Sequence, residues 1–207
     1  MEAIDAIKKA KEESKDRNFT QSLDLIINIE DLELDNPENR FSENIVMPYP
    51  ASEETKICVI GDTLTQNAEN ADKEITEDRL EEYFEDQDKA KDLAEEYDFF
   101  IAESPLMPDI GKQLGPVLGP RDKMPKPMTP GSDPTDKIEE LRKTVSINLK
   151  EHPSVKCKIG NEAMKDEDVA ENANAIINRV RENLPRGDHN VKATYIKLTM
   201  GPAIKVN

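Results

Sequence analysis

Residues 111–128 read GKQLGPVLGPRDKMPKPM, and this stretch divides the chain. Of the 8 glycines and 14 prolines in the sequence, 4 glycines and 8 prolines fall between Pro105 and Pro134. Proline removes a backbone donor and fixes φ while glycine leaves the backbone free, so one continuous helix or central strand is excluded. Four basic residues stand here against Asp122 alone, in a chain of net charge -16: Lys112, Arg121, Lys123 and Lys126. This contrast predicts a functional loop.

Around this loop the sequence alternates buried strands with helices. Residues 56–60 (KICVI) and 99–102 (FFIA) are continuous apolar runs, as expected for buried parallel strands. Residues 76–97 predict one long charged helix, and residues 133–143 predict a second one. The order strand, helix, strand, helix is typical of a three-layer α/β, Rossmann-like domain.

The two ends of the chain predict elements of an α+β kind. Helices are expected over residues 1–15 and 166–184, and strands over residues 23–29, 44–49, 144–149, 155–159 and 191–200. Neither end is long enough to bury its own apolar faces. We therefore expect a split α+β domain made of residues 1–55 and 151–207, with an α/β domain of residues 56–150 inserted between them.

Composition excludes several classes of protein. The sequence contains no apolar run of 18 residues, and its first twenty residues lack an apolar signal core, so neither a membrane span nor secretion is expected. Cys58 and Cys157 lie in apolar runs, which favours buried thiols in a reducing cytoplasm over a disulfide or a catalytic pair. Residues 62–103 carry 16 acidic and 4 basic residues, whereas residues 190–207 carry no acid. Because binding depends on the local patch, the acidity weakens an RNA-binding hypothesis without excluding it.

Three separated motifs give the chain a family resemblance. The segments LGPVLGPR with KMPKP (residues 114–127), RNFTQS (17–22) and KLTMGP (197–202) resemble those of the ribosomal protein L-one family, from the mobile stalk beside the tRNA exit site. With PENRF (37–41), the wording is most similar to archaeal members. The resemblance implies the split two-domain fold, a monomer within the cytoplasmic ribosome, and neither enzymatic activity nor a cofactor.

The resemblance also implies a function and a site. It implies binding to the stalk of large-subunit rRNA, help in releasing deacylated tRNA from the exit site, and repression of the protein's own mRNA. It assigns rRNA binding to Phe19, Ser22, Thr199, Met200 and Gly201. Two positions depart from the family pattern: Asn18, where members often have a basic residue, and Ala193, where they often have serine.

Basic residues supply further candidate contacts. Near the two motifs at the chain ends, the candidates for phosphate contact are Arg17, Lys192 and Lys197. In the inserted domain, the candidates for an auxiliary RNA contact are Lys112, Arg121, Lys123 and Lys126.

The residues alone leave other interpretations open. Phe19 and Met200 also suit a hydrophobic core, and the inserted domain also suits a stand-alone α/β nucleotide- or ligand-binding enzyme. The Walker pattern requires Ser or Thr after Gly-Lys, but Gln113 follows Lys112, and no GxGxxG occurs. His152 and His189 lie in polar, turn-like segments without a Cys or carboxylate at ligand spacing, which indicates surface histidines and no metal site. One acid run indicates a solvated helix face: Glu81, Glu82, Glu85, Asp86 and Asp88.

Overall fold

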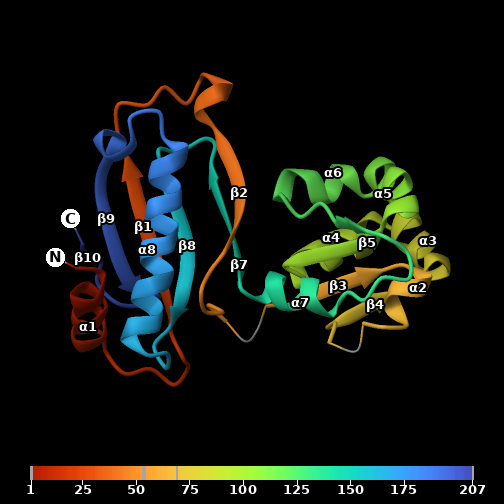
Figure 1. Cartoon of the computed structure of the whole chain (residues 1–207), viewed down its shortest axis with the longest axis horizontal. Helices are drawn as coiled ribbons and strands as arrows, with labels where there is room; N and C mark the ends of the chain where they lie inside the picture. Colours follow the sequence, from red (N-terminus) through yellow and green to blue (C-terminus); the bar gives the residue numbers. More distant parts are fainter. Residues whose placement is uncertain (1, 53–54, 69, 207) are drawn as a thin grey trace. The chain divides into compact units, whose positions relative to one another are not determined.

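The computed structural model describes residues 2–52, 55–68 and 70–206, and it divides into two compact units (Figure 1). Unit 1 combines both chain ends, Met1–Ser52 and Lys143–Asn207, and unit 2 is the inserted segment Glu53–Arg142. The start of the first predicted helix, Met1, and residues 53–54 at the first predicted boundary lie outside the described residues. Among the helices of the described part, none is both long and apolar enough to cross a bilayer.

Unit 1 is built on an antiparallel sheet in the order β10-β9-β1-β8. Its strands are β1 (Ser22–Ile29), β8 (Ser154–Asn161), β9 (Val191–Leu198) and β10 (Ile204–Lys205). The period of two along β1 buries four side chains on one face: Leu23, Leu25, Ile27 and Ile29. Helices α1 (Ala3–Glu13) and α8 (Asp166–Asn183) pack their apolar sides into the same core, and Figure 1 shows α8 lying along the sheet.

A second pair of strands in unit 1 corrects the predicted domain boundary. β2 (Phe41–Val46) pairs antiparallel with β7 (Thr144–Leu149). The sequence predicts an inserted domain that extends to residue 150, but Ile147 and Leu149 of β7 are buried in the core of unit 1. The boundary therefore lies at Arg142. β7 directly follows a helix of unit 2 in sequence, whereas its distant hydrogen-bond partner decides its unit.

The end of β2 also differs from the predicted strand over residues 44–49. Asn172 of α8 is fully buried, and its amide oxygen accepts a hydrogen bond from Tyr49 N at 3.0 Å. Its amide nitrogen donates to Tyr49 O at 3.0 Å and to Ile159 O at 2.9 Å. The backbone of Tyr49 is thus satisfied by a helix side chain, so the strand ends at Val46.

Unit 2 is a three-layer α/β domain, which confirms the predicted fold class. Its parallel strands, in the order β4-β3-β5-β6, are β3 (Ile57–Ile60), β4 (Lys73–Ile75), β5 (Phe99–Glu103) and β6 (Lys126–Met128). Alternate residues of β3 enter separate cores on the two faces of the sheet. One core is covered by α3 (Glu77–Glu85), α4 (Gln87–Glu96), α5 (Met107–Gln113) and α6 (Gly115–Leu118). The other is covered by α2 (Asp62–Thr65) and α7 (Thr135–Arg142).

Two predictions for unit 2 are wrong in detail. The long helix over residues 76–97 is divided at Asp86, whose carboxylate accepts hydrogen bonds from Asp88 N at 3.0 Å and Lys89 N at 3.2 Å and so caps α4. The expected loop over residues 111–128 contains the end of α5, α6, a 3-10 turn and the edge strand β6. Pro116 and Pro120 each stand in the first turn of a short helix, where a missing N–H is tolerated, so proline divides the helical segments.

Candidate nucleic-acid interface

The two ends of the chain meet at one edge of the unit-1 sheet. Thr199, directly after β9, donates its backbone N–H to the carbonyl of Ser22 at 3.0 Å, and its hydroxyl donates to the same carbonyl at 3.3 Å. Gly201 N then donates to Leu198 O at 2.9 Å, which closes a tight turn before β10. The structure thus brings three predicted site residues together, although Ser22 and Thr199 are 177 positions apart in sequence.

Gln21 holds this edge together, although it is not among the predicted site residues. Its side chain is only 1% exposed, and its amide oxygen accepts a hydrogen bond from Met200 N at 3.1 Å. The amide nitrogen donates to Ser14 Oγ at 3.2 Å, just after α1, and the backbone N–H donates to Glu162 Oε1 at 2.8 Å, just after β8. The backbone and side chain of one buried residue on β1's N-terminal side therefore join α1, β1, β8 and the turn after β9.

A signal for Gln21 is present in the sequence. Positions 21, 23, 25, 27 and 29 share one face of an extended segment, and all except position 21 are Leu or Ile. A polar amide at the end of such an apolar row enters the core, and a buried amide requires hydrogen-bond partners. The alternation therefore identifies Gln21 as a buried polar residue, although it does not identify the partners.

The two apolar residues of the predicted site are exposed. Phe19 is 53% exposed and Met200 is 59% exposed, so the interpretation of both as core residues is wrong. The side chain of Gln21 accepts a hydrogen bond from the backbone N–H of Met200 and so anchors the turn of Met200. Gln21 itself follows Phe19 by two residues in sequence. Phe19 thus presents an exposed aromatic ring, the kind of side chain on which unpaired RNA bases stack, and Met200 presents an exposed, flexible thioether.

Packing within the protein explains why glycine stands at position 201. A Cβ atom at this position would lie 3.2 Å from Leu198 Cβ and 3.3 Å from Ser14 Oγ. The bare backbone therefore serves the close packing of this turn against the end of α1. This contact accounts for the glycine without a ligand, so Gly201 supports the edge that Thr199 and Met200 present.

The candidate phosphate contacts separate into two groups. Arg17 is exposed in the segment before Phe19, and Lys197 lies two residues before Thr199 on β9. Lys192 is at the opposite end of β9, seven residues from Thr199, which is about 23 Å along a strand. It also lies 3.8 Å from Glu30. Lys192 therefore lies apart from Phe19 and Thr199, and its phosphate contact stays a prediction separate from this edge.

Three of the four basic residues predicted as auxiliary contacts are engaged within unit 2. Lys123 Nζ donates to Ala94 O and Tyr97 O, each at 2.9 Å, and so caps the end of α4. Arg121 donates to Val117 O at 3.1 Å and lies 3.5 Å from Glu95. Lys126 lies 5.8 Å over the ring of Phe99. Lys112 is exposed on α5, so the auxiliary contact now depends mainly on this residue.

The chain matches a known family over most of its length. The model of the Ribosomal protein L1p/L10e family matches residues 8–202. The chain belongs to this family. It is 45% identical over 208 residues to "Large ribosomal subunit protein uL1" of Methanothermobacter thermautotrophicus, which covers 99% of this chain and 98% of the relative. The protein of the same name from Methanothermococcus thermolithotrophicus is 47% identical over 205 residues, covering 98% and 96%. The one from Haloarcula marismortui is 42% identical over 207 residues, covering 99% and 98%.

Membership of the L1p/L10e family confirms the resemblance drawn from the three motifs, and these archaeal relatives carry the name of a ribosomal protein, not of an enzyme. The geometry of unit 2 agrees with this. In doubly wound sheets, ligands bind at the carboxyl ends of the strands where the strand order reverses, here between β3 and β5. At that point the Glu103 carboxylate accepts hydrogen bonds from Thr63 N at 2.7 Å, Thr63 Oγ1 at 2.8 Å and Leu64 N at 3.1 Å. The protein's own carboxylate fills the position.

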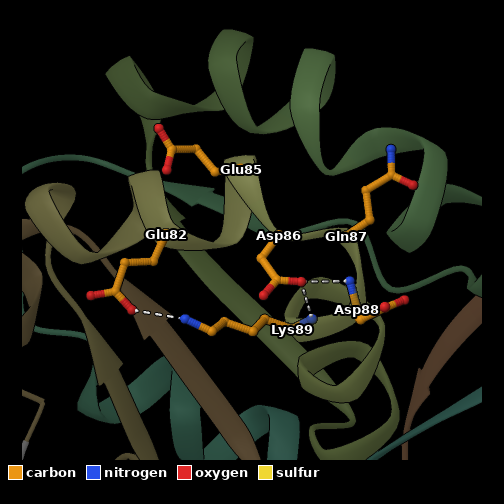
Figure 2. Close-up of a pocket in the computed structure, with 6 residues that line it drawn as sticks. All are labelled: Glu82, Glu85, Asp86, Gln87, Asp88 and Lys89. Atoms are coloured by element: carbon orange, nitrogen blue, oxygen red, sulfur yellow. Dashed lines mark hydrogen bonds and ion pairs between the residues drawn. The ribbon is translucent and has the colours of Figure 1, made fainter.

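Four residues of the acid run line a surface hollow at the junction of α3 and α4 (Figure 2): Glu82, Glu85, Asp86 and Asp88. Figure 2 shows Asp86 accepting the hydrogen bonds that cap α4, and Lys89 Nζ lies 3.4 Å from Glu82. The run is a solvated helix face, as predicted. Among the described residues, no group of three or more His, Cys, Asp or Glu is arranged to hold a metal ion. His152 and His189 are both exposed.

Proposed function

We propose that this chain is the uL1 protein of the large ribosomal subunit and that it binds the stalk region of the rRNA through the edge of the unit-1 sheet. We define this Phe19–Met200 edge by Phe19, Ser22, Thr199, Met200 and Gly201. The observation that carries the proposal is the exposure of Phe19 and Met200 on either side of Gln21, whose buried side chain anchors the turn of Met200, in a member of a ribosomal protein family. Its place is then the cytoplasmic ribosome, as one copy per stalk.

The chemistry of the edge favours RNA over a small ligand. Among the described residues, Phe19 and Met200 are the two large apolar side chains that are more than half exposed, and exposed apolar patches rimmed by polar residues mark interaction sites. Sequence-specific RNA recognition targets unpaired bases, which stack on apolar and aromatic side chains, and it uses hydroxyl groups to contact the 2′-OH. Phe19 and Met200 supply the first kind of contact, Thr199 and Ser22 supply the second, and Arg17 and Lys197 stand near them for phosphates.

Filter binding of the full chain to a stalk rRNA fragment tests this proposal. We expect Met200→Ala and Thr199→Ala each to weaken binding by about 1–3 kcal/mol, as for the loss of a buried interface contact. Neither variant should unfold the protein, because both side chains are exposed. Met124→Ala is the matched control, since Met124 is also exposed, at 40%, but belongs to unit 2. Wild-type affinity in both edge variants would refute the assignment of the site.

We propose two further roles that follow from the same RNA-binding edge. If the protein represses its own mRNA, the leader of that mRNA competes with stalk rRNA for the edge, and Met200→Ala weakens both complexes by a similar factor. A leader that binds equally well to wild type and Met200→Ala would contradict this. If the protein assists the exit of tRNA, ribosomes without it release deacylated tRNA more slowly in a chase experiment, and adding the protein back restores the rate.

A further inference from the structure

On the face of the unit-1 sheet that points away from α1 and α8, charged and apolar side chains are arranged in rows across the strands. Directly paired residues of neighbouring strands point to the same side, so the strand register defines the rows across this open face. The register places Lys158, Asp24 and Lys197 in one row. The next row, two residues further from the Phe19–Met200 edge, is Lys156, Ile26, Tyr195 and Lys205.

The second row has an apolar centre and basic ends. Tyr195 and Ile26 lie side by side and are each half-buried, whereas Lys156 on β8 and Lys205 on β10 are exposed at the two sides. Sheets that bind single-stranded RNA use this pattern, in which a base stacks on an aromatic ring at the centre and basic side chains meet the phosphates. The row is contiguous with the Phe19–Met200 edge, because Lys197 leads from Tyr195 to Thr199 along β9.

The charge of this face is opposite to that of the chain. Among the residues that β1, β8, β9 and β10 place on it, four are lysines and Asp24 alone is acidic. Asp24 stands between Lys158 and Lys197; burial raises the pKa of its carboxyl group, and the two lysines oppose this by favouring the charged form. Taking these positions together, the face carries a net charge of 4 − 1 = +3, in a protein of net charge -16. A polyanion is therefore the partner that this charge complements.

We propose that this open face binds an unpaired segment of RNA, with one base stacked on Tyr195 and its neighbouring phosphates on Lys156, Lys197 and Lys205. The proposal rests on the proposed function, because it extends the Phe19–Met200 edge into a surface across the sheet. It assigns four residues of β8, β9 and β10 a binding role. Lys197 is already a candidate contact of the edge, so the test uses the other three.

Binding of the full chain to a stalk rRNA fragment, measured over a salt series, tests the two kinds of contact separately. Tyr195→Leu keeps an apolar strand residue but removes the ring, and we expect binding to weaken by about 5- to 150-fold, as for one lost stacked base, with an unchanged salt dependence. Tyr195→Phe keeps the ring and should keep wild-type affinity. In the double variant Lys156→Gln and Lys205→Gln, the slope of log K against log salt should become shallower by about 1.5, since each phosphate contact contributes roughly 0.7 to 0.9.

The control is a second double variant, Lys8→Gln with Lys165→Gln. Both lysines are exposed in unit 1 on the helical side, so the slope should stay within about 0.5 of wild type. Wild-type affinity and slope in Tyr195→Leu and in the Lys156 and Lys205 variant, with Met200→Ala still weakened, would overturn this inference alone and leave the proposed function intact. That is also the outcome if the face docks a protein instead of RNA. A wild-type chain that does not bind the fragment would end both proposals. Equal losses in Tyr195→Phe and Tyr195→Leu would refute the stacked base.

Discussion

Replacing Gln21 by leucine should loosen the edge that we assign to RNA. The amide makes two hydrogen bonds of good length, from Met200 N at 3.1 Å and to Ser14 Oγ at 3.2 Å. Two longer ones, to Lys15 O and Glu162 Oε2, are both 3.4 Å. Leucine has a similar size but can neither donate nor accept, so each of these groups loses its partner at a site that is 1% exposed.

The expected cost follows from the buried partners. A buried polar group that loses its hydrogen bond costs about 1–3 kcal/mol. Met200 N–H loses its acceptor, whereas Ser14 is half-exposed and can turn to water, and Glu162 keeps the hydrogen bond from the backbone N–H of residue 21. We therefore expect Gln21→Leu to lower the free energy of unfolding of unit 1 by about 1–3 kcal/mol. Affinity for stalk rRNA should also fall, because the backbone of Met200 is no longer fixed.

Native-state hydrogen exchange, followed by mass spectrometry on peptides from β1 and β9, measures this cost for unit 1 separately from unit 2. The matched control is Gln66→Leu, which removes an exposed amide that donates to Asp62 O at 3.2 Å in unit 2. This control should change the stability of unit 2 by no more than about 0.5 kcal/mol. If β1 and β9 exchange at wild-type rates in Gln21→Leu, the buried amide does not hold the edge and our account of Gln21 is wrong.

Three further predictions concern unit 2 and the two thiols. Gly61→Ala should destabilise unit 2 by more than about 2 kcal/mol in urea denaturation, because φ at Gly61 is +138° and the new Cβ would lie 2.4 Å from Glu103 Cγ. The control is Gly119→Ala: Gly119 has helical backbone angles and no atom within 4 Å of an added Cβ, so this change should be neutral or slightly stabilising. Burial raises the pKa of Glu103, but the hydrogen bonds from Leu64 and Thr63 together lower it below the ordinary 4.5. Wild type should therefore be more stable than Glu103→Gln by about 1–3 kcal/mol above pH 4.5, and this difference should disappear as pH falls through the lower folded-state pKa. Burial raises the pKa of Cys58 and of Cys157 to about 12, so a thiol reagent at pH 8 should modify neither until the protein is unfolded, and rapid labelling of the native chain would contradict their burial.

The elements that could be predicted from the sequence are those with a long, clear period. α8 has apolar residues at helical spacing over eighteen positions, and β1 alternates over eight, so local pattern alone identifies both. β4 has three residues and β10 has two, which is too short for a period to appear. The sequence predicts that residues 144–149 form a strand, but it does not show which unit this strand belongs to, because its partner β2 lies about a hundred residues earlier.

The site shows the same division between local pattern and tertiary contact. Neither period nor spacing distinguishes an exposed Phe19 or Met200 from a core residue, so the motif resemblance carried that prediction. From the sequence, Lys123 is a candidate for RNA contact, and only the fold shows that its ammonium group donates to carbonyls at the end of α4. Lys192 looked close to Thr199 in sequence, yet a strand separates two residues by about 3.3 Å per position and takes them to opposite ends of the sheet.

The acidity of the protein and its binding of RNA are compatible because charge acts locally. At physiological ionic strength exposed charges are screened over about 8 Å, so the potential at a binding face is set by its own residues and their neighbours. In unit 1 several acidic side chains are held by partners within the fold, such as Asp166 by Lys11 at 2.6 Å and Glu162 by the backbone of Gln21. The open face keeps one acid among four lysines. A chain of this composition binds a polyanion by keeping acidic residues off one face, so changing Asp24 to asparagine, which removes the last acid there, should tighten RNA binding rather than weaken it.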